Sequence, residues 1–306
     1  MTEEPIFVDR MIAAIDAKRA PVCVGIDPML DSFPPELMPK DRRDLDACVD
    51  AIYAFCLGVL QAVAPIVPVV KFQSAYFERF LWQGVQAYYE LIHEARQLGL
   101  LVIGDVKRGD IGSTSEAYAD AHLAPINFDD IDDAAAPDAI TINPYLGLDA
   151  IEPFLQTCVH ESTGVFVLVR TSNPGSKDVQ DVVTQAGQTL AEHVADLLHT
   201  SSQRPTLMGQ NGYSNLGAVV GATQTHTMTS LRARLPRSYF LLPGYGTQGA
   251  TADMTRAAFD AQGCGAIVSA SRSVLYPKKI AGESWQEAIE RAAKTMTDDV
   301  RAVAKI

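Results

Sequence analysis

Eight short apolar runs recur along this chain of 306 residues, and stretches with helical spacing of apolar residues separate them. This alternation is typical of parallel β/α units, because a parallel strand pair needs a long crossover that is usually helical. Eight units can close into a barrel with a packed interior, whereas a doubly wound open sheet is the alternative. The chain length and the number of runs favour a single (β/α)8 TIM barrel over residues 1–306. The runs span residues 21–28, 66–73, 100–107, 139–145, 164–170, 216–223, 238–243 and 265–272.

Helical spacing predicts the segments that should cover this barrel. Helices are expected over 6–19, 47–63, 82–98 and 182–199, and from residue 285 to the end of the chain. Ser113 and Glu116 have the spacing of a capping box and predict the start of another helix. Three loops match no motif, and they cover residues 29–46, 125–137 and 201–216.

Charged residues close several of the apolar runs. Asp27, Lys71, Asp105 and Lys107 each stand at a predicted carboxyl end, where barrel enzymes carry their active sites. Strand residues alternate faces, so Asp105 and Lys107 should share the face of Ile103. These groups could be a solvated charge cluster. Desolvating them without partners would be costly, however, and perturbed charges at the end of a buried strand more often have a function.

Glycines follow the seventh run in the string Gly244-Tyr245-Gly246-Thr247-Gln248-Gly249. A dinucleotide fingerprint has this spacing, but it belongs to the first strand of a βαβ unit and needs an acid about 20 residues later. We therefore expect a phosphate site in the loops after the seventh and eighth strands, with Gln248 as a neutral donor and Arg272 as a bidentate cation. A tight turn and a surface ion pair are the structural alternatives.

Composition excludes several classes of protein. A net charge of -12 argues against nucleic acid and anionic membrane partners. We identify no apolar run of the roughly 18 to 20 residues that a membrane span requires. The start of the chain has no basic region followed by an apolar one, as a signal peptide would have. We therefore expect a soluble, cytoplasmic protein. The five cysteines are scattered and the six histidines form no metal-binding spacing. Free thiols and no metal site are therefore expected.

The motif Asp105-x-Lys107-x-x-Asp110-Ile111 resembles the signature of the orotidine 5'-monophosphate decarboxylase family. The flanking Lys-Arg-Gly-Asp-Ile-Gly-Ser-Thr resembles its longer, bacterial second subgroup. The resemblance implies conversion of orotidine 5'-monophosphate to uridine 5'-monophosphate and CO2 without a cofactor, the last step of de novo UMP biosynthesis. The carbanion left at C6 lies in the ring plane and cannot be delocalised, so preorganised charges must stabilise it. Lys107 would stabilise and protonate this carbanion.

The resemblance also implies roles for other residues. Lys71, Asp105, Lys107 and Asp110 would form an alternating charged array at the reacting carbon. Asp110, with Ile111 and Thr114, would cross to the site of a neighbouring subunit, which implies a homodimer with shared active sites. The remaining residues would bind substrate: Asp27 and Gln73 at the ribose, Ser172 at the pyrimidine, and Pro243, Gln248 and Arg272 at the base and phosphate.

Three other functions fit parts of the pattern. Magnesium-dependent phosphosugar decarboxylases and hexulose-phosphate synthases share Asp-x-Lys-x-x-Asp, but they use an acid at the end of strand two, where this chain has Lys71. A Schiff-base aldolase would need a lysine with a lowered pKa, whereas both lysines here should stand beside carboxylates. A non-enzymatic binding module would leave the convergent charges without a role.

Overall fold

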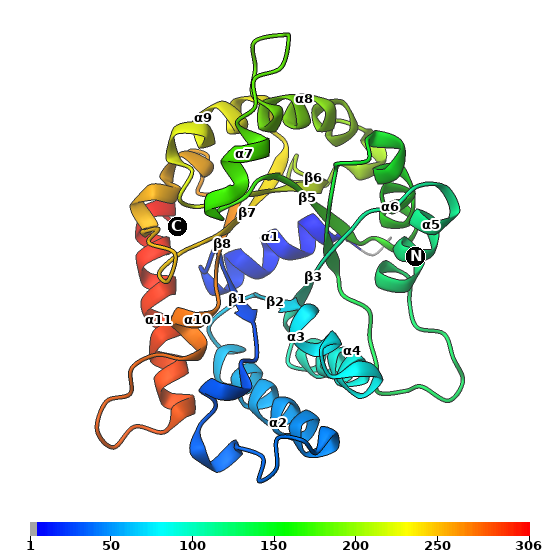
Figure 1. Ribbon diagram of the computed structural model, residues 1–306. Helices are drawn as coiled ribbons and strands as arrows, with labels where there is room; N and C mark the ends of the chain where they lie inside the picture. The colour runs from blue at the N-terminus through cyan, green and yellow to red at the C-terminus, as the bar shows by residue number, and fades with distance from the viewer. Residues whose placement is uncertain (1–4) are drawn as a thin grey trace.

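The computed structural model describes residues 5–306, and within this range eight parallel strands close into a barrel in chain order (Figure 1). The predicted TIM barrel is thereby confirmed, and the open sheet is excluded because β1 pairs with β8. The strands are β1 (Val22–Ile26), β2 (Val69–Gln73), β3 (Leu101–Arg108), β4 (Ala139–Ile142), β5 (Gly164–Arg170), β6 (Ser214–Val220), β7 (Ser238–Pro243) and β8 (Ala266–Ala270).

Helices form the outer ring of the barrel, and α1 (Phe7–Lys18) lies across one end of it (Figure 1). The longest helices are α2 (Leu45–Val63), α4 (Leu81–Gln97) and α11 (Trp285–Ala304). The others are α3 (Ala75–Glu78), α5 (Gly112–Leu123), α6 (Leu148–Glu161), α7 (Lys177–Gln180), α8 (Leu190–Ser202), α9 (Thr225–Arg234) and α10 (Arg272–Leu275).

Two apolar cores hold this architecture together. The inner core joins barrel residues such as Val69, Ile103 and Phe166 to Phe7 and Met11 of α1. The outer core lies between the strands and the surrounding helices. Because α1 packs against the barrel interior near the start of the strands, the chemistry is left to the opposite end, where the carboxyl ends of the strands meet.

The predicted helix over 182–199 is wrong in its first half. Residues 181–189 form a projecting loop between α7 and α8, at the top of Figure 1, and Val183 pairs with Thr189 in an antiparallel bridge. The helix begins later because the Thr189 side chain accepts a hydrogen bond from the backbone of Glu192, and the Glu192 side chain caps Thr189 in return.

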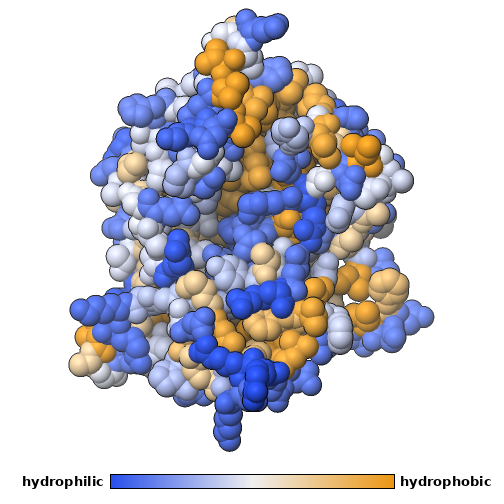
Figure 2. Space-filling view, viewed as in Figure 1, coloured by the Kyte–Doolittle hydropathy of each residue, from blue (hydrophilic) through white to orange (hydrophobic). Residues whose placement is uncertain are grey.

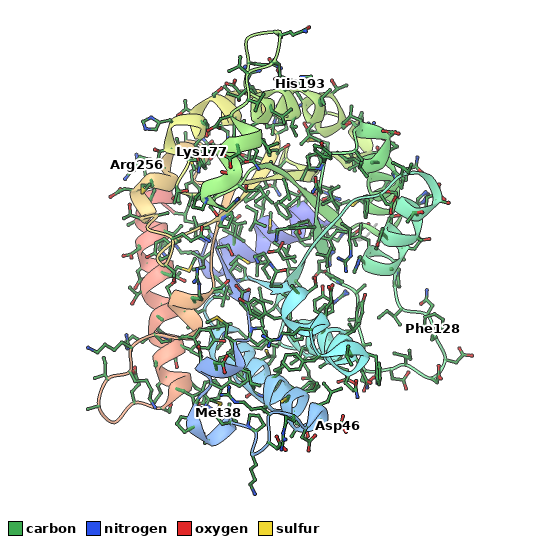
Figure 3. All side chains as sticks on the ribbon, in the orientation of Figure 1. Met38, Asp46, Phe128, Lys177, His193 and Arg256 are labelled. Atoms are coloured by element: carbon green, nitrogen blue, oxygen red, sulfur yellow. The ribbon has the colours of Figure 1, made fainter. Side chains whose placement is uncertain are left out.

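The capping box expected at Ser113 and Glu116 is also wrong. Ile111 is the N-cap residue of α5 and makes no side-chain cap, and Ser113 already lies inside the helix. The segment 201–216 is only partly a loop, because α8 continues to Ser202 and β6 begins at Ser214. The acidic loop before β4 is irregular as expected, and the side chain of Phe128 there points away from the barrel (Figure 3).

The expectation about membrane-length segments needs correction at α2. This helix has 19 residues and is long and apolar enough, by length and composition, to cross a membrane. Eight of its residues are buried where it packs against α4 and α11, which accounts for its apolar sequence. The amino-terminal segment considered above lies largely outside the described residues. All five cysteines are free thiols, as expected, and Cys264 is the one that is partly exposed.

Candidate active site

A cavity of about 490 Å³ opens at the carboxyl ends of the strands. Figure 2 shows this face of the molecule hollowed near its centre, with hydrophilic residues inside the hollow. The cavity wall combines polar side chains with apolar ones from the strands, such as Leu168, Val219 and Leu241. Nine of the twelve predicted site residues line it: Asp27, Lys71, Gln73, Asp105, Lys107, Ser172, Pro243, Gln248 and Arg272.

Asp105 is the centre of the charged part of the cavity. Its Oδ2 accepts hydrogen bonds from Lys71 Nζ at 2.6 Å and Gln73 Nε2 at 3.0 Å. Its Oδ1 accepts from Lys107 Nζ at 2.6 Å and Thr141 Oγ1 at 2.8 Å. A carboxylate has about four lone-pair positions, so these donors saturate it. The ammonium groups of Lys71 and Lys107 thus bind different oxygens of the same Asp105 carboxylate.

The ion pairs overcome the cost of burial. Burial disfavours the charged carboxylate, but the ammonium groups of Lys71 and Lys107 hold the pKa of Asp105 well below its usual range. Burial likewise opposes the charge on Lys71, yet Asp105 and Asp27 raise the pKa of this amine above its ordinary value. Asp105 is therefore an anion and Lys71 a cation at neutral pH.

Lys107 does not follow the regular alternation that the sequence suggests. Its backbone has a φ of 47°, in the left-handed region, and the pairing between β3 and β4 shifts between Gly104 and Arg108. The Lys107 side chain is 44% exposed, whereas those of Lys71 and Asp105 are 7% and 9% exposed. A bulge thus separates a lysine that faces the open cavity from an acid at its floor.

The glycine string after β7 forms part of the cavity wall. Gly244, Gly246 and Gly249 have φ angles of 114°, 74° and 88°, which glycine adopts at little cost. Gly244 and Gln248 line the cavity together with Arg272, which begins α10 after β8. Among the described residues, no hydrogen bond or ion pair engages the Arg272 side chain. The loop after β7 and the segment after β8 therefore place an unpaired guanidinium beside the glycine-rich backbone, an arrangement suited to binding phosphate.

The loop after β5 brings Ser172 to the cavity. Arg170 anchors this loop, because its Nε lies 3.1 Å from Asp181 Oδ1 and its Nη1 donates to Gln180 and Ser176. A side chain at Gly221, after β6, would meet Ser172: an added Cβ would lie 2.9 to 3.0 Å from its Cα, Cβ and N atoms. Ser172 can therefore occupy its place in the cavity wall only because residue 221 is glycine.

Asp27 lines the cavity after β1, and its Oδ1 atom is buried without a hydrogen-bond partner in the described part of the chain. A buried acceptor without a donor is costly, which indicates that a ligand or water supplies one. An added Cβ at Gly25 would lie 2.0 Å from Ser271 Oγ and 3.5 Å from Asp27 Oδ1. The close approach of β1 to the loop after β8 thus depends on glycine.

Three predicted residues lie outside the cavity of their own chain. Asp110 Oδ1 accepts from the backbone N of Ile111 at 2.8 Å, and Ile111 is 58% exposed at the start of α5. Thr114 is exposed on the first turn of that helix. The described chain therefore brings together Lys71, Asp105 and Lys107 but does not bring Asp110 to them.

Sequence reasoning missed several polar residues of the cavity. Thr141 of β4 is 1% exposed and bonded to Asp105, and Ser269 of β8 also lines the wall. The signal for both was a hydroxyl inside an otherwise apolar strand. Thr171 and Gln180 follow β5 and had no such signal. Among the described residues, no group of three His, Cys, Asp or Glu side chains is arranged to hold a metal ion.

Sequence comparison identifies relatives that share this site-bearing barrel. Residues 20–284 match the family described as Orotidine 5'-phosphate decarboxylase / HUMPS family. The chain belongs to this family. The match includes the ends of all eight strands, so the resemblance read from the Asp-x-Lys-x-x-Asp motif extends over the barrel.

Curated members of the orotidine 5'-phosphate decarboxylase family match over nearly their whole length. The protein of that name from Rhodopirellula baltica is 40% identical over 303 residues, covering 96% of this chain and 99% of the relative. The one from Clostridium acetobutylicum is 34% identical over 299 residues, covering 97% and 99%. Both are bacterial and of matching length, in agreement with the longer bacterial subgroup.

Solved structures of the family give the same barrel. A Streptomyces avermitilis protein has a TM-score of 0.79 at 33% identity, and the match covers all of this chain and 98% of that one. The Leishmania donovani OMP decarboxylase has a TM-score of 0.71 at 28% identity, with 98% and 100% covered.

Proposed function

We propose that this chain is an orotidine 5'-phosphate decarboxylase, a carboxy-lyase that forms uridine 5'-monophosphate and CO2 in the last step of UMP synthesis. The family match and the names of the curated relatives support this activity. The single structural observation that carries it is Asp105, buried and bonded on opposite oxygens to Lys71 and Lys107. The cytoplasmic location stays a prediction.

The chemistry needs no electron sink if charge is arranged in advance. The bond from C6 to the carboxyl carbon breaks, CO2 leaves, and the electron pair stays on C6. Lys107 faces the cavity and would stabilise this pair as an ammonium ion, then transfer a proton from Nζ to C6. Asp105, which bonds both lysines, would lie next to the leaving carboxylate and hold the lysines in place, and water would return the proton to Lys107. The step as written uses no cofactor.

Substrate binding would use the remaining wall of the cavity. Arg272 and Gln248 would hold the phosphate, with Pro243 beside the base. Ser172 would bind the pyrimidine edge. Asp27, whose buried Oδ1 lacks a donor among the described residues, would accept from a ribose hydroxyl near Lys71 and Gln73. Phosphate binding remote from C6 would supply energy that is used in the transition state.

We infer that a second copy of the chain completes the site. Asp110, Ile111 and Thr114 carry the family motif but lie outside the cavity of their own chain. The segments after β2, β3 and β4 are in contact around these residues. The Arg108 side chain forms an ion pair with Glu78 of α3, and the Arg108 carbonyl oxygen accepts a hydrogen bond from the backbone N of Asn143. Large apolar side chains are exposed on these segments, as at an interface: Leu81, Trp82, Ile111, Tyr145, Leu146 and Leu148.

The other functions are less well supported. A Schiff base requires a neutral amine, whereas Asp105 and Asp27 raise the pKa of Lys71. The magnesium-dependent members of this barrel class need an acid at the end of strand two, whereas β2 ends in Lys71, Phe72 and Gln73 and carries no acid. No observation favours a binding module over an enzyme.

The test is an absorbance assay of orotidine 5'-monophosphate consumption with and without chelator. The wild type should turn over at the same rate in both conditions. Lys107→Ala should abolish turnover in a folded protein, and Lys294→Ala is the control because Lys294 pairs with Glu290 on the outer helix α11. A wild type without activity, or a Lys107→Ala variant with the wild-type rate, would refute the proposal.

A further inference from the structure

The hydroxyl of Thr141 connects two parts of the charged cluster. Thr141 Oγ1 lies 2.8 Å from Asp105 Oδ1 and 3.1 Å from the backbone N of Lys107. The residue is 1% exposed and comes from β4, whereas both of its partners belong to β3. One buried side chain thus contacts the acid and the backbone of the lysine that the acid holds.

The direction of both hydrogen bonds is determined by the partners. A backbone N–H can only donate, so Thr141 accepts from Lys107. An ionised carboxylate can only accept, so the one hydroxyl proton of Thr141 is donated to Asp105. The hydroxyl therefore has a single orientation, and both bonds are lost together if it is removed.

The backbone of Lys107 depends on this contact. The ladder between β3 and β4 pairs Gly104 with Ile140 and then Arg108 with Ile142, so Lys107 lies in the register shift and has no paired residue on β4. Its backbone N–H donates to the Thr141 side chain of β4 instead. The left-handed φ of 47° at Lys107 is unfavourable for a residue with a side chain and needs such support.

We propose that Thr141 is a positioning residue that sets the Lys107 amine over the reacting carbon by holding the bulge and the Asp105 carboxylate in one geometry. The effect on catalysis rests on the proposed decarboxylase function. The effect on Lys107 geometry does not, since it follows from the contacts alone. Thr141 itself would not touch the atoms that react.

The experiment compares Thr141→Val, which keeps the shape but lacks the hydroxyl, with Thr141→Ser, which keeps it. Thr141→Val should lower kcat about 10- to 100-fold with KM changed less than about 3-fold, since the lost bonds involve a charged partner and act in the transition state. Thr141→Ser should retain a rate close to wild type. The affinity for uridine 5'-monophosphate, which lacks the carboxylate, should be nearly unchanged in both variants.

Thr297→Val is the matched control. Thr297 is buried in α11, and its hydroxyl has no hydrogen-bond partner in the described structure. This variant should keep the wild-type kcat, so a loss shared by both valine variants would indicate a general packing effect and contradict the proposal.

A crystal structure of Thr141→Val separates this inference from the proposed function. Lys107 should leave the left-handed region and its Nζ should move away from Asp105 Oδ1, whether or not the wild type consumes orotidine 5'-monophosphate. An unchanged Lys107 in that structure, or an unchanged kcat in an active enzyme, would overturn the role of Thr141. Inactivity of the wild type would count against the decarboxylase function alone.

Discussion

Lys71 of β2 and Asp105 of β3 form a buried ion pair, with 2.6 Å between Nζ and Oδ2 and side-chain exposures of 7% and 9%. The pair bridges neighbouring strands at the floor of the cavity, where the register places Gln73 beside Asp105. Burying two charges is costly, and breaking such a pair leaves the other charge uncompensated. The cluster is therefore rigid before substrate arrives, which electrostatic catalysis requires.

This pair should make the free energy of unfolding depend on pH at both extremes. The folded-state pKa of Asp105 is depressed, so its contribution is present above the unfolded value of about 3.9 and is lost as pH falls. The folded-state pKa of Lys71 is raised, so its contribution is present below about 10.4 and is lost as pH rises. Urea unfolding across this window should show the pair's full contribution between about pH 5 and about pH 9.

In Lys71→Met, the free energy of unfolding should no longer fall through loss of the Lys71 charge as the pH rises. It should still fall at acid pH, but by less than in the wild type, because Lys107 and Thr141 still bond Asp105. The control Lys294→Met removes an exposed pair on α11 and should change stability by less than about 1 kcal/mol at any pH. If the free energy of unfolding of Lys71→Met followed the same pH dependence as that of the wild type, the buried pair would not be the cause of that dependence.

Gly221→Ala should impair substrate binding through Ser172. The new methyl group would lie within 3.0 Å of Ser172 backbone and side-chain atoms, so the loop after β5 has to move. We expect KM for orotidine 5'-monophosphate to rise roughly 10-fold, the equivalent of about 1.4 kcal/mol. Steady-state kinetics measure this. Gly175→Ala, in the same loop but with its nearest neighbour 3.7 Å away, should leave KM as it is, and equal effects would argue against the contact.

Arg272→Ala should weaken recognition of the phosphate. A charge-assisted hydrogen bond contributes about 1.5 to 3 kcal/mol, so kcat/KM should fall at least about 10-fold for the nucleotide. Decarboxylation of the nucleoside orotidine, which has no phosphate, should be unaffected by the same substitution. Arg256→Ala, on the periphery in Figure 3 and paired with Asp253, serves as the control. An equal loss with both substrates would place Arg272 elsewhere in the mechanism.

Mixed dimers should reveal a shared active site. Lys107→Ala and Asp110→Ala homodimers should each be inactive, because every site lacks one essential group. After mixing and subunit exchange, half of the molecules are heterodimers with one intact site, so about a quarter of the wild-type activity should return. Recovery is read from the decarboxylation rate against time after mixing. An Asp110→Ala homodimer with full activity, or no recovery despite exchange, would exclude a crossed Asp110.

Much of the barrel was predictable because its strands are apolar and short. The runs that carry Asp27, Lys71 and Lys107 near their carboxyl ends correspond to β1, β2 and β3, and the closure of eight parallel strands brings these ends to one face. That geometric rule is why residues separated by about two hundred positions, such as Lys71 and Arg272, could be assigned to one cavity.

The errors occurred where local patterns compete with tertiary contacts. The residues from Val182 to Thr189 have helical apolar spacing, yet they pair as a hairpin and the cap at Thr189 starts the helix instead. The apolar length of α2 reflects burial against two neighbouring helices, which composition alone does not distinguish from a membrane span. At Ser113 the motif was present, but the helix begins at Gly112 and makes no use of it.

The sequence by itself determined which chemical groups stand at the ends of the strands, and in what order, because strand and helix periodicity are local properties. Only the tertiary structure decided how those groups pair. The four donors on Asp105 come from β2, β3 and β4, and the lysine that faces the cavity depends on a bulge held by Thr141. Hydrogen bonds change over tenths of an ångström, and such positions follow from strand register and packing rather than from spacing along the chain.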